Sequence, residues 1–170
     1  MSVEVRLANG DGEAAIVGNL MSLYLFEHSA TTERQIEPDG AYRYSSLDVF
    51  WAEAGCYPFL IRTDGELAGF ALVAERRLFE EGQEGHLIAE FFILPTHRLR
   101  GIGQAAAGLI FSQFPGEWWI PQPHWNEAAQ AFWRTVVKRY SGGNFSEDPW
   151  IWDDESGVAQ AFTVPGTSES

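Results

Sequence analysis

The 170 residues are 45% hydrophobic and 21% charged, a balance typical of one globular domain and not of a disordered chain. The formal net charge of −13 argues against a nucleic-acid partner, because phosphate contacts need a basic surface, and it favours a cationic or amine partner. The single cysteine excludes an internal disulfide, and the apolar runs are too short for a transmembrane helix, so we expect a cytoplasmic protein without a membrane partner.

The beginning of the chain has patterns that predict one strand and two helices. Residues 3–7 alternate as a short strand, and apolar residues recur at helical spacing over 13–28. A polar loop follows, in which Pro38-Asp39-Gly40 predicts a turn. Ser46 is placed to cap a second helix over 47–54.

A hairpin and a central strand are predicted next. Asp64-Gly65 stands between two strand-like segments, 59–62 and 67–74, and this pair is typical of a tight turn. The segment 86–94 is apolar on both faces, which indicates a strand in the middle of a sheet that is covered on both sides.

Strict alternation along this central strand predicts which side chains share a face. It places Leu87 and Phe91 on one face, and Ile88 and Phe92 on the other.

The next segments predict a helix over 102–114 and a short strand over 118–120. Pro121 and Pro123 follow that strand, and neither can donate a hydrogen bond to a ladder. We therefore expect strand pairing to fail at these prolines.

The end of the chain predicts a capped helix and two strands. Asn126 caps the helix, Gly142-Gly143 ends it, and strands near 150–153 and 158–164 close the sheet. The chain then divides into one domain and a disordered tail, over residues 1–165 and 166–170.

The turn between the central strand and the next helix has the chemistry of a phosphate site. Gly101 and Gly103 stand where the helix begins, and the first N–H groups of a helix have no internal partner. The helix dipole favours an anion there, and glycine lets it approach the main chain. His97, Arg98 and Arg100 add positive charge. The alternative is a tight turn with solvated arginines, but the strand before it, the helix after it and Arg98 favour the phosphate site.

Arg98-Leu99-Arg100-Gly101-Ile102-Gly103 resembles the Arg/Gln-x-x-Gly-x-Gly/Ala motif of the GNAT superfamily of N-acetyltransferases. Phe92-Ile93-Leu94-Pro95 is similar to that family's fourth strand, and the segment from Asn126 to Trp133 resembles its next helix. The resemblance implies an α+β (mixed α/β) fold. Its central, mostly antiparallel, twisted sheet has six to seven strands, is splayed between strands four and five, and is flanked by about four helices.

The resemblance also implies acetyl-CoA as co-substrate and no metal. The N–H groups from Leu99 to Gln104 would hold the pyrophosphate, and the pantetheine arm would pair with the backbone of Phe92 and Leu94. The cofactor-binding residues that it implies are Phe92, Ile93, Leu94, Arg98, Leu99, Arg100, Gly101, Ile102, Gly103, Gln104, Asn126, Phe132 and Trp133.

The implied reaction is the attack of an amine on a thioester, which needs a base and a donor for the oxyanion. The resemblance implies a backbone N–H near Leu94 as that donor. Glu90 is the candidate base, because it is the sole charge in the run 87–95 and burial would raise its pKa. The alternative is a structural ion pair between Glu90 and Arg43 or Arg62.

Trp133 departs from the family pattern, which has a proton-donating tyrosine at this position. Tryptophan cannot protonate a thiolate, so Tyr140, His124 or solvent would serve, or turnover is slow. We predict that Trp133 packs beside the cofactor. Asn126 is either a helix cap alone or also a contact of the pantetheine arm.

The acceptor is expected in the aromatic front half of the chain, where we predict Tyr24, His28 and Trp51 as substrate-binding residues. The leading hypothesis is direct acetyl transfer to a primary amine of a small molecule. The alternatives are a catalytically weak acyl-CoA-binding module, serving as a sensor or partner-binding subunit, and an acyltransferase that acts on a protein or peptide amine. Seven tryptophans leave room for a homodimer.

Overall fold

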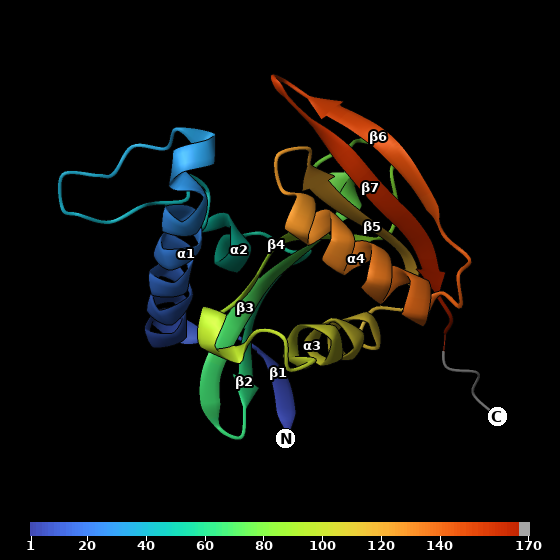
Figure 1. Ribbon diagram of the computed structural model, residues 1–170, viewed down its shortest axis with the longest axis horizontal. Coiled ribbons are helices and arrows are strands. Elements are labelled where there is room, and N and C mark those ends of the chain that lie inside the picture. Colours follow the sequence, from blue (N-terminus) through green and yellow to red (C-terminus); the bar gives the residue numbers. More distant parts are fainter. Residues whose placement is uncertain (167–170) are drawn as a thin grey trace.

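One seven-stranded sheet forms the centre of the computed structural model, which describes residues 1–166 (Figure 1). The strands lie in the order β1-β2-β3-β4-β5-β7-β6. They span Val3–Leu7 (β1), Cys56–Thr63 (β2), Glu66–Glu75 (β3), His86–Ile93 (β4), Gly116–Pro123 (β5), Ser146–Trp152 (β6) and Glu155–Val164 (β7). Neighbouring strands are antiparallel except β4 and β5, which run parallel. The predicted fold class is confirmed, whereas the expected tail lies outside the described residues from position 167 on.

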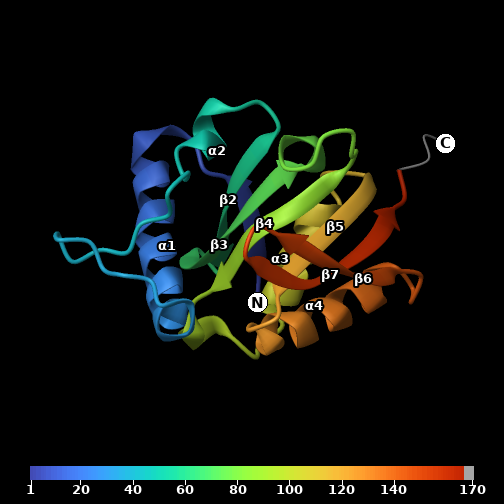
Figure 2. The same cartoon turned by 90° about the horizontal axis from the view of Figure 1, so that it is seen from above.

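Helices cover both faces of the sheet (Figure 2). They span Gly10–Thr32 (α1), Val49–Ala52 (α2), Ile102–Phe111 (α3) and Glu127–Tyr140 (α4), with 3-10 helices at Arg76–Leu78 (η1) and Pro95–His97 (η2). Helices α1 and α2 pack on the face that buries Phe70 and Leu72, and α3 and α4 pack on the face that buries Phe59 and Ile61. Within the described part of the chain, the helices are too short or too polar to cross a membrane.

The first two helices differ from their predicted bounds. Helix α1 begins at Gly10, earlier than predicted. The Glu13 carboxylate accepts a hydrogen bond from the Asn9 N–H at 2.7 Å, and this bond stabilises residues 10–12 as the first turn of the helix. Helix α2 is a single turn, and Ser46 does not cap it. Its length is set by tertiary contacts: Phe50 is buried, and Trp51 Nε1 donates to the Ala8 carbonyl at 2.9 Å.

A β-bulge in β4 changes which of its side chains share a face. Leu72 and Val73 of β3 pair with Glu90 and Ile88, so Ala89 is an extra residue on β4. One extra residue reverses the alternation. Phe91 therefore shares a core with Ile88, and the prediction that it lies on the face of Leu87 is wrong.

The expected separation of β4 and β5 is confirmed, but its relation to the prolines differs from the prediction. The two strands pair only at His86–Trp118 and Leu87–Trp119, and β5 then continues through both prolines along β7 to Pro123. The His124 N–H donates to Ser156 across this ladder, so the alternating N–H groups place the nitrogens of Pro121 and Pro123 on the β4 side. The prolines thus leave the β7 ladder intact and remove donors only from the edge that faces β4.

Candidate active site

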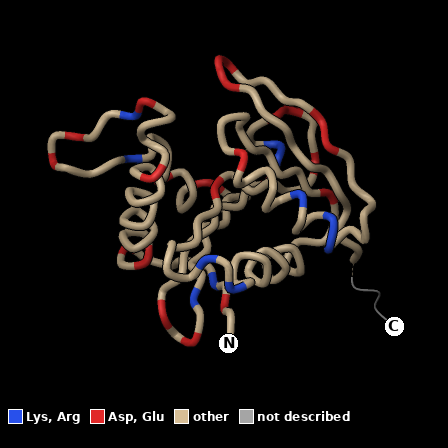
Figure 3. The backbone as a smooth tube through the Cα atoms, in the orientation of Figure 1, with Lys and Arg blue, Asp and Glu red and all other residues tan. Residues whose placement is uncertain are grey.

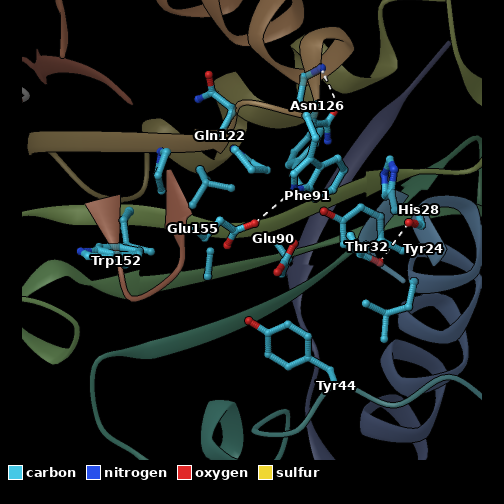
Figure 4. Close-up of a pocket in the computed structure, with 18 of the residues that line it drawn as sticks. Tyr24, His28, Thr32, Tyr44, Glu90, Phe91, Gln122, Asn126, Trp152 and Glu155 are labelled. Atoms are coloured by element: carbon cyan, nitrogen blue, oxygen red, sulfur yellow. Dashed lines mark hydrogen bonds between the residues drawn. The ribbon is translucent and has the colours of Figure 1, made fainter. Parts of the chain in front are cut away.

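A cleft of about 480 Å³ opens where β4 and β5 separate. Its walls come from α1, the loop 33–48, the two separating strands, the start of α4 and the β6–β7 hairpin (Figure 4). The lining includes Tyr24, His28, Arg34, Tyr44, Phe79, Glu90, Phe91, Trp125, Asn126, Trp133, Trp152 and Glu155.

The edge of β4 that faces the gap carries the main-chain groups of Phe91 and Ile93. The Leu94 N–H donates to Ala68 of β3 at 2.8 Å, so alternation turns the groups of Phe92 and Leu94 toward β3 and those of Phe91 and Ile93 toward the gap. The predicted use of the Phe92 and Leu94 backbone, including an N–H near Leu94 as oxyanion donor, is therefore corrected. The groups of Phe92 and the Leu94 N–H already belong to the β3–β4 ladder, and the Leu94 carbonyl accepts from the His97 N–H at 2.9 Å.

The turn before α3 presents unbonded N–H groups. Gly101 has a φ of 77° and stands at the N-cap of α3 without a side-chain cap. The first backbone bond of the helix runs from Ala105 to the Gly101 carbonyl, so the N–H groups of Ile102, Gly103 and Gln104 have no intrahelical acceptor. Leu99 also has a positive φ, of 59°, and its side chain is fully exposed. This geometry can hold a phosphate by main-chain groups.

The two glycines of the turn have different roles. A Cβ on Gly101 would meet nothing within 4 Å, so its requirement is the positive φ. A Cβ on Gly103 would lie 3.2 Å from the Phe132 ring, so this glycine lets α3 pack closely against α4. The Phe132 ring therefore packs against Gly103.

Arg98 is held by protein groups and is not a free cation. Its Nε donates to the Ile93 carbonyl at 2.7 Å, and its two terminal nitrogens bind Glu27 of α1 at 2.7 and 2.9 Å. The Arg98 guanidinium keeps the pKa of Glu27 below its usual value. Arg98 thus ties the turn to β4 and to α1, whereas Arg100 is exposed. The role of Glu27 was not predicted, because a partner 71 residues away leaves no signal in the spacing.

Glu90 lies in the cleft and faces Tyr24, Tyr44 and Glu155 (Figure 4). Burial raises the pKa of Glu90 to about 7; hydrogen bonding by the hydroxyls of Tyr24 and Tyr44 opposes this shift, and the charge of Glu155 adds to it. Burial and the neighbouring Glu90 in turn raise the pKa of Tyr24 and Tyr44. A carboxylate with this pKa is suited to accept a proton near neutral pH.

The alternative of a structural ion pair for Glu90 does not hold for the arginines considered. Arg43 pairs with Asp39, and Arg62 donates to the Gly65 carbonyl.

Trp133 stands where the family has its tyrosine, and the structure shows where this residue, the possible replacements for the tyrosine and Asn126 lie. Trp133 is buried, with its ring 5.0 Å from that of Phe91, as expected for a packing residue. The Tyr140 hydroxyl donates to the Gln104 carbonyl, and neither Tyr140 nor His124 lines the cleft. Asn126 lines it and also caps α4, since its Oδ1 accepts from the Ala129 N–H at 3.0 Å.

On the acceptor side, the structure brings Tyr24 and His28 to the cleft but not Trp51. The His28 ring lies 5.0 Å from Tyr24 and 5.1 Å from Trp125, and burial lowers the pKa of His28. Trp51 lines a separate groove along α1, where its indole N–H bonds to Ala8. The residues that the sequence did not reveal here are Phe79, Trp125, Trp152 and Glu155.

Within residues 1–166, no group of three or more His, Cys, Asp or Glu side chains is arranged to hold a metal ion.

Comparisons with known proteins point in the same direction as this geometry. A family model described as "Acetyltransferase (GNAT) family" matches residues 21–136. No curated protein matches the sequence.

Solved structures share the fold at low sequence identity. Aminoglycoside acetyltransferase AAC(6')-Ib in complex with coenzyme A is 14% identical, with 95% of each chain covered and a TM-score of 0.65. A structure described as histone acetyltransferase HPA2 and related acetyltransferase, from Corynebacterium glutamicum, is 14% identical, with 100% of each chain covered and a TM-score of 0.64. The ribosomal-protein-S18-alanine N-acetyltransferase from Escherichia coli is 15% identical, with 99% of this chain and 98% of that chain covered and a TM-score of 0.56.

Proposed function

Because this chain belongs to the GNAT family of acetyltransferases, we propose that it transfers the acetyl group of acetyl-CoA directly to a primary amine of a small molecule. The observation that carries the proposal is the position of Glu90. A carboxylate with a pKa of about 7 lies in the cleft that the unpaired edge of β4 borders. Amine attack on an acyl donor needs a base, and a free strand edge can pair with an extended ligand beside it.

The free edge of β4 and the turn before α3 fit acetyl-CoA. The unbonded N–H groups at the start of α3 would hold the pyrophosphate, and the main chain of Phe91 and Ile93 would pair with the pantetheine arm. The Ile93 carbonyl is already occupied by Arg98, which leaves the Ile93 N–H and both groups of Phe91 for this role. When bound, acetyl-CoA supplies a thioester as acyl donor.

The chain's own residues then act on the proton and on the charge. Glu90 accepts a proton from the ammonium form of the acceptor, directly or through water, and so makes the nitrogen nucleophilic. An N–H on the free edge of β4 can stabilise the oxygen that gains charge. No tyrosine of α4 lines the cleft, so we assign protonation of the leaving thiolate to solvent.

Trp133 supports a second candidate, an acyl-CoA-binding module with little catalysis, since it stands where the family has an acidic hydroxyl. The two candidates differ in one measurement. We expect calorimetry to show binding of acetyl-CoA, and thiol release to appear with at least one amine in a panel of diamines, amino acids, aminoglycosides and peptides. Binding without thiol release from any amine would favour the module, and release with peptides alone would favour a protein amine as acceptor.

A further inference from the structure

Three exposed aromatic rings cluster at the end of the cleft near the β6–β7 hairpin, and a clustered apolar patch on a surface is a marker of a binding site. Trp125 and Trp152 are each 36% exposed and Phe79 is 47% exposed, and all three line the cleft. They come from three separate segments: the β5–α4 loop, the β6–β7 hairpin and the segment after η1.

Cross-strand pairing places the side chains of Trp152 and Glu155 next to each other in the cleft. They are directly opposite each other across the two-residue turn of the β6–β7 hairpin, so their side chains lie on one face (Figure 4). The Trp152 ring is held by Trp119 and Trp150, with ring centroids 5.1 and 5.2 Å away, and it stacks on Phe79 at 6.4 Å.

Glu155 is fixed by one oxygen and free at the other. Its Oε1 accepts a hydrogen bond from Trp125 Nε1 at 3.1 Å, and within residues 1–166 its Oε2 takes part in no hydrogen bond or ion pair. The turn that precedes it adds Asp153 and Asp154, and the tip of this hairpin is strongly acidic (Figure 3). A carboxylate among aromatic faces is a favourable environment for an ammonium group.

Glu155 lines the same cleft as Glu90, and its charge helps to raise the pKa of Glu90. The other charged or titratable groups of the lining are Tyr24 and His28 from α1, and Arg34 and Tyr44 from the loop 33–48. The Arg34 side chain is directed by its bond to the Arg43 carbonyl within that loop.

We propose that the acceptor carries, besides the reacting amine, a second ammonium group that is bound by Glu155 between the rings of Trp125, Trp152 and Phe79. This inference rests on the proposed function for the identity of the reacting amine, but the second site is defined by its own residues. Alkyl diamines and aminoglycosides both contain this chemistry.

The test compares one cation with two. Binding to the CoA-loaded protein is followed by calorimetry for butylamine, 1,4-diaminobutane and trans-1,4-diaminocyclohexane, in the wild type, Glu155→Gln and Glu81→Gln. Glu81 is exposed on the loop after η1, so Glu81→Gln controls for the loss of one surface charge. We expect at least one dication to bind tenfold or more tightly than butylamine, and this advantage to vanish in Glu155→Gln and persist in Glu81→Gln.

The outcomes separate this inference from the proposed function. Preference for 1,4-diaminobutane assigns the site to open-chain diamines, and preference for trans-1,4-diaminocyclohexane alone assigns it to ring-borne amines. Equal binding of butylamine and both dications, or an unchanged preference in Glu155→Gln, overturns the second site. If dications bind through Glu155 but no amine is acetylated, the proposed function fails and the second site stands.

Discussion

The two proposed binding regions, a cofactor side and an acceptor side, use different parts of the chain. On the cofactor side, the available groups are main-chain N–H and C=O groups, from the β4 edge and from the turn at Gly101. On the acceptor side, they are side chains such as Glu90, Tyr44 and Glu155, which come from β4, a loop and a hairpin far apart in sequence. A binding site made of main-chain groups can thus be encoded by one short motif. A site made of side chains from distant segments forms only when the whole sheet has folded.

The largest effect should come from removing the base on the acceptor side. We expect Glu90→Gln to lower kcat about 100-fold or more, because general-base catalysis contributes roughly 10² to 10⁴ in rate. The Kd of acetyl-CoA should stay unchanged, since the amide keeps the shape of the carboxylate. An equal kcat in the two proteins from pH 6 to 9 would remove Glu90 from the mechanism. If the affinity for acetyl-CoA fell as much as kcat in Glu90→Gln, the cofactor side and the acceptor side would not be independent.

The same carboxylate should also make stability depend on pH. The pKa of Glu90 is about 7 in the folded chain against 4.5 as the ordinary value, so the folded state binds more protons between these values. The contribution of Glu90 to stability therefore falls as pH rises from about 4.5 through 7. Glutamine does not ionise, so Glu90→Gln should gain on the order of 1–3 kcal/mol over the wild type between pH 4.5 and 8. Urea unfolding at the two pH values measures this, and an equal difference at both contradicts the raised pKa.

The cofactor side should respond to a change of backbone conformation. An L residue in the left-handed region costs about 1–2 kcal/mol, more when it is β-branched. We expect Gly101→Val, at a φ of 77°, to weaken acetyl-CoA binding about tenfold in calorimetry, because the turn must change to relieve the strain. Gly142→Val is the matched control: its φ is 62°, its Cβ also meets nothing within 4 Å, and it lies after α4. Similar losses of Tm with a loss of affinity only in Gly101→Val support the turn, and equal affinities in both refute it.

The same contrast explains how much could be predicted from the sequence. The Asp64-Gly65 hairpin, the Asn126 cap and the glycine turn depend on neighbours within a few residues, and the structure has all three. The bulge at Ala89 could not be predicted, because it depends on the register with β3. Neither could the bond between Trp125 and Glu155, whose partners are 30 residues apart.

The prediction made from the two prolines was correct in part. Pro121 and Pro123 indicated where the ladder would lose donors, but not on which side of β5. That side is set by the pairing with β7, which the local sequence does not contain.

The smallest effect is expected from a side chain on the cofactor side. Leu99 is next to the glycine turn, its φ is 59°, and its side chain is fully exposed. Leu99→Ala keeps the Cβ and the backbone conformation and removes only atoms that contact no other part of the protein. We expect the Kd of acetyl-CoA and the Tm to stay within about twofold and about 1 °C of the wild type, as for an exposed position away from packing. A loss as large as that in Gly101→Val would mean that the Leu99 side chain itself holds the nucleotide, and the cofactor side would then depend on side chains as the acceptor side does.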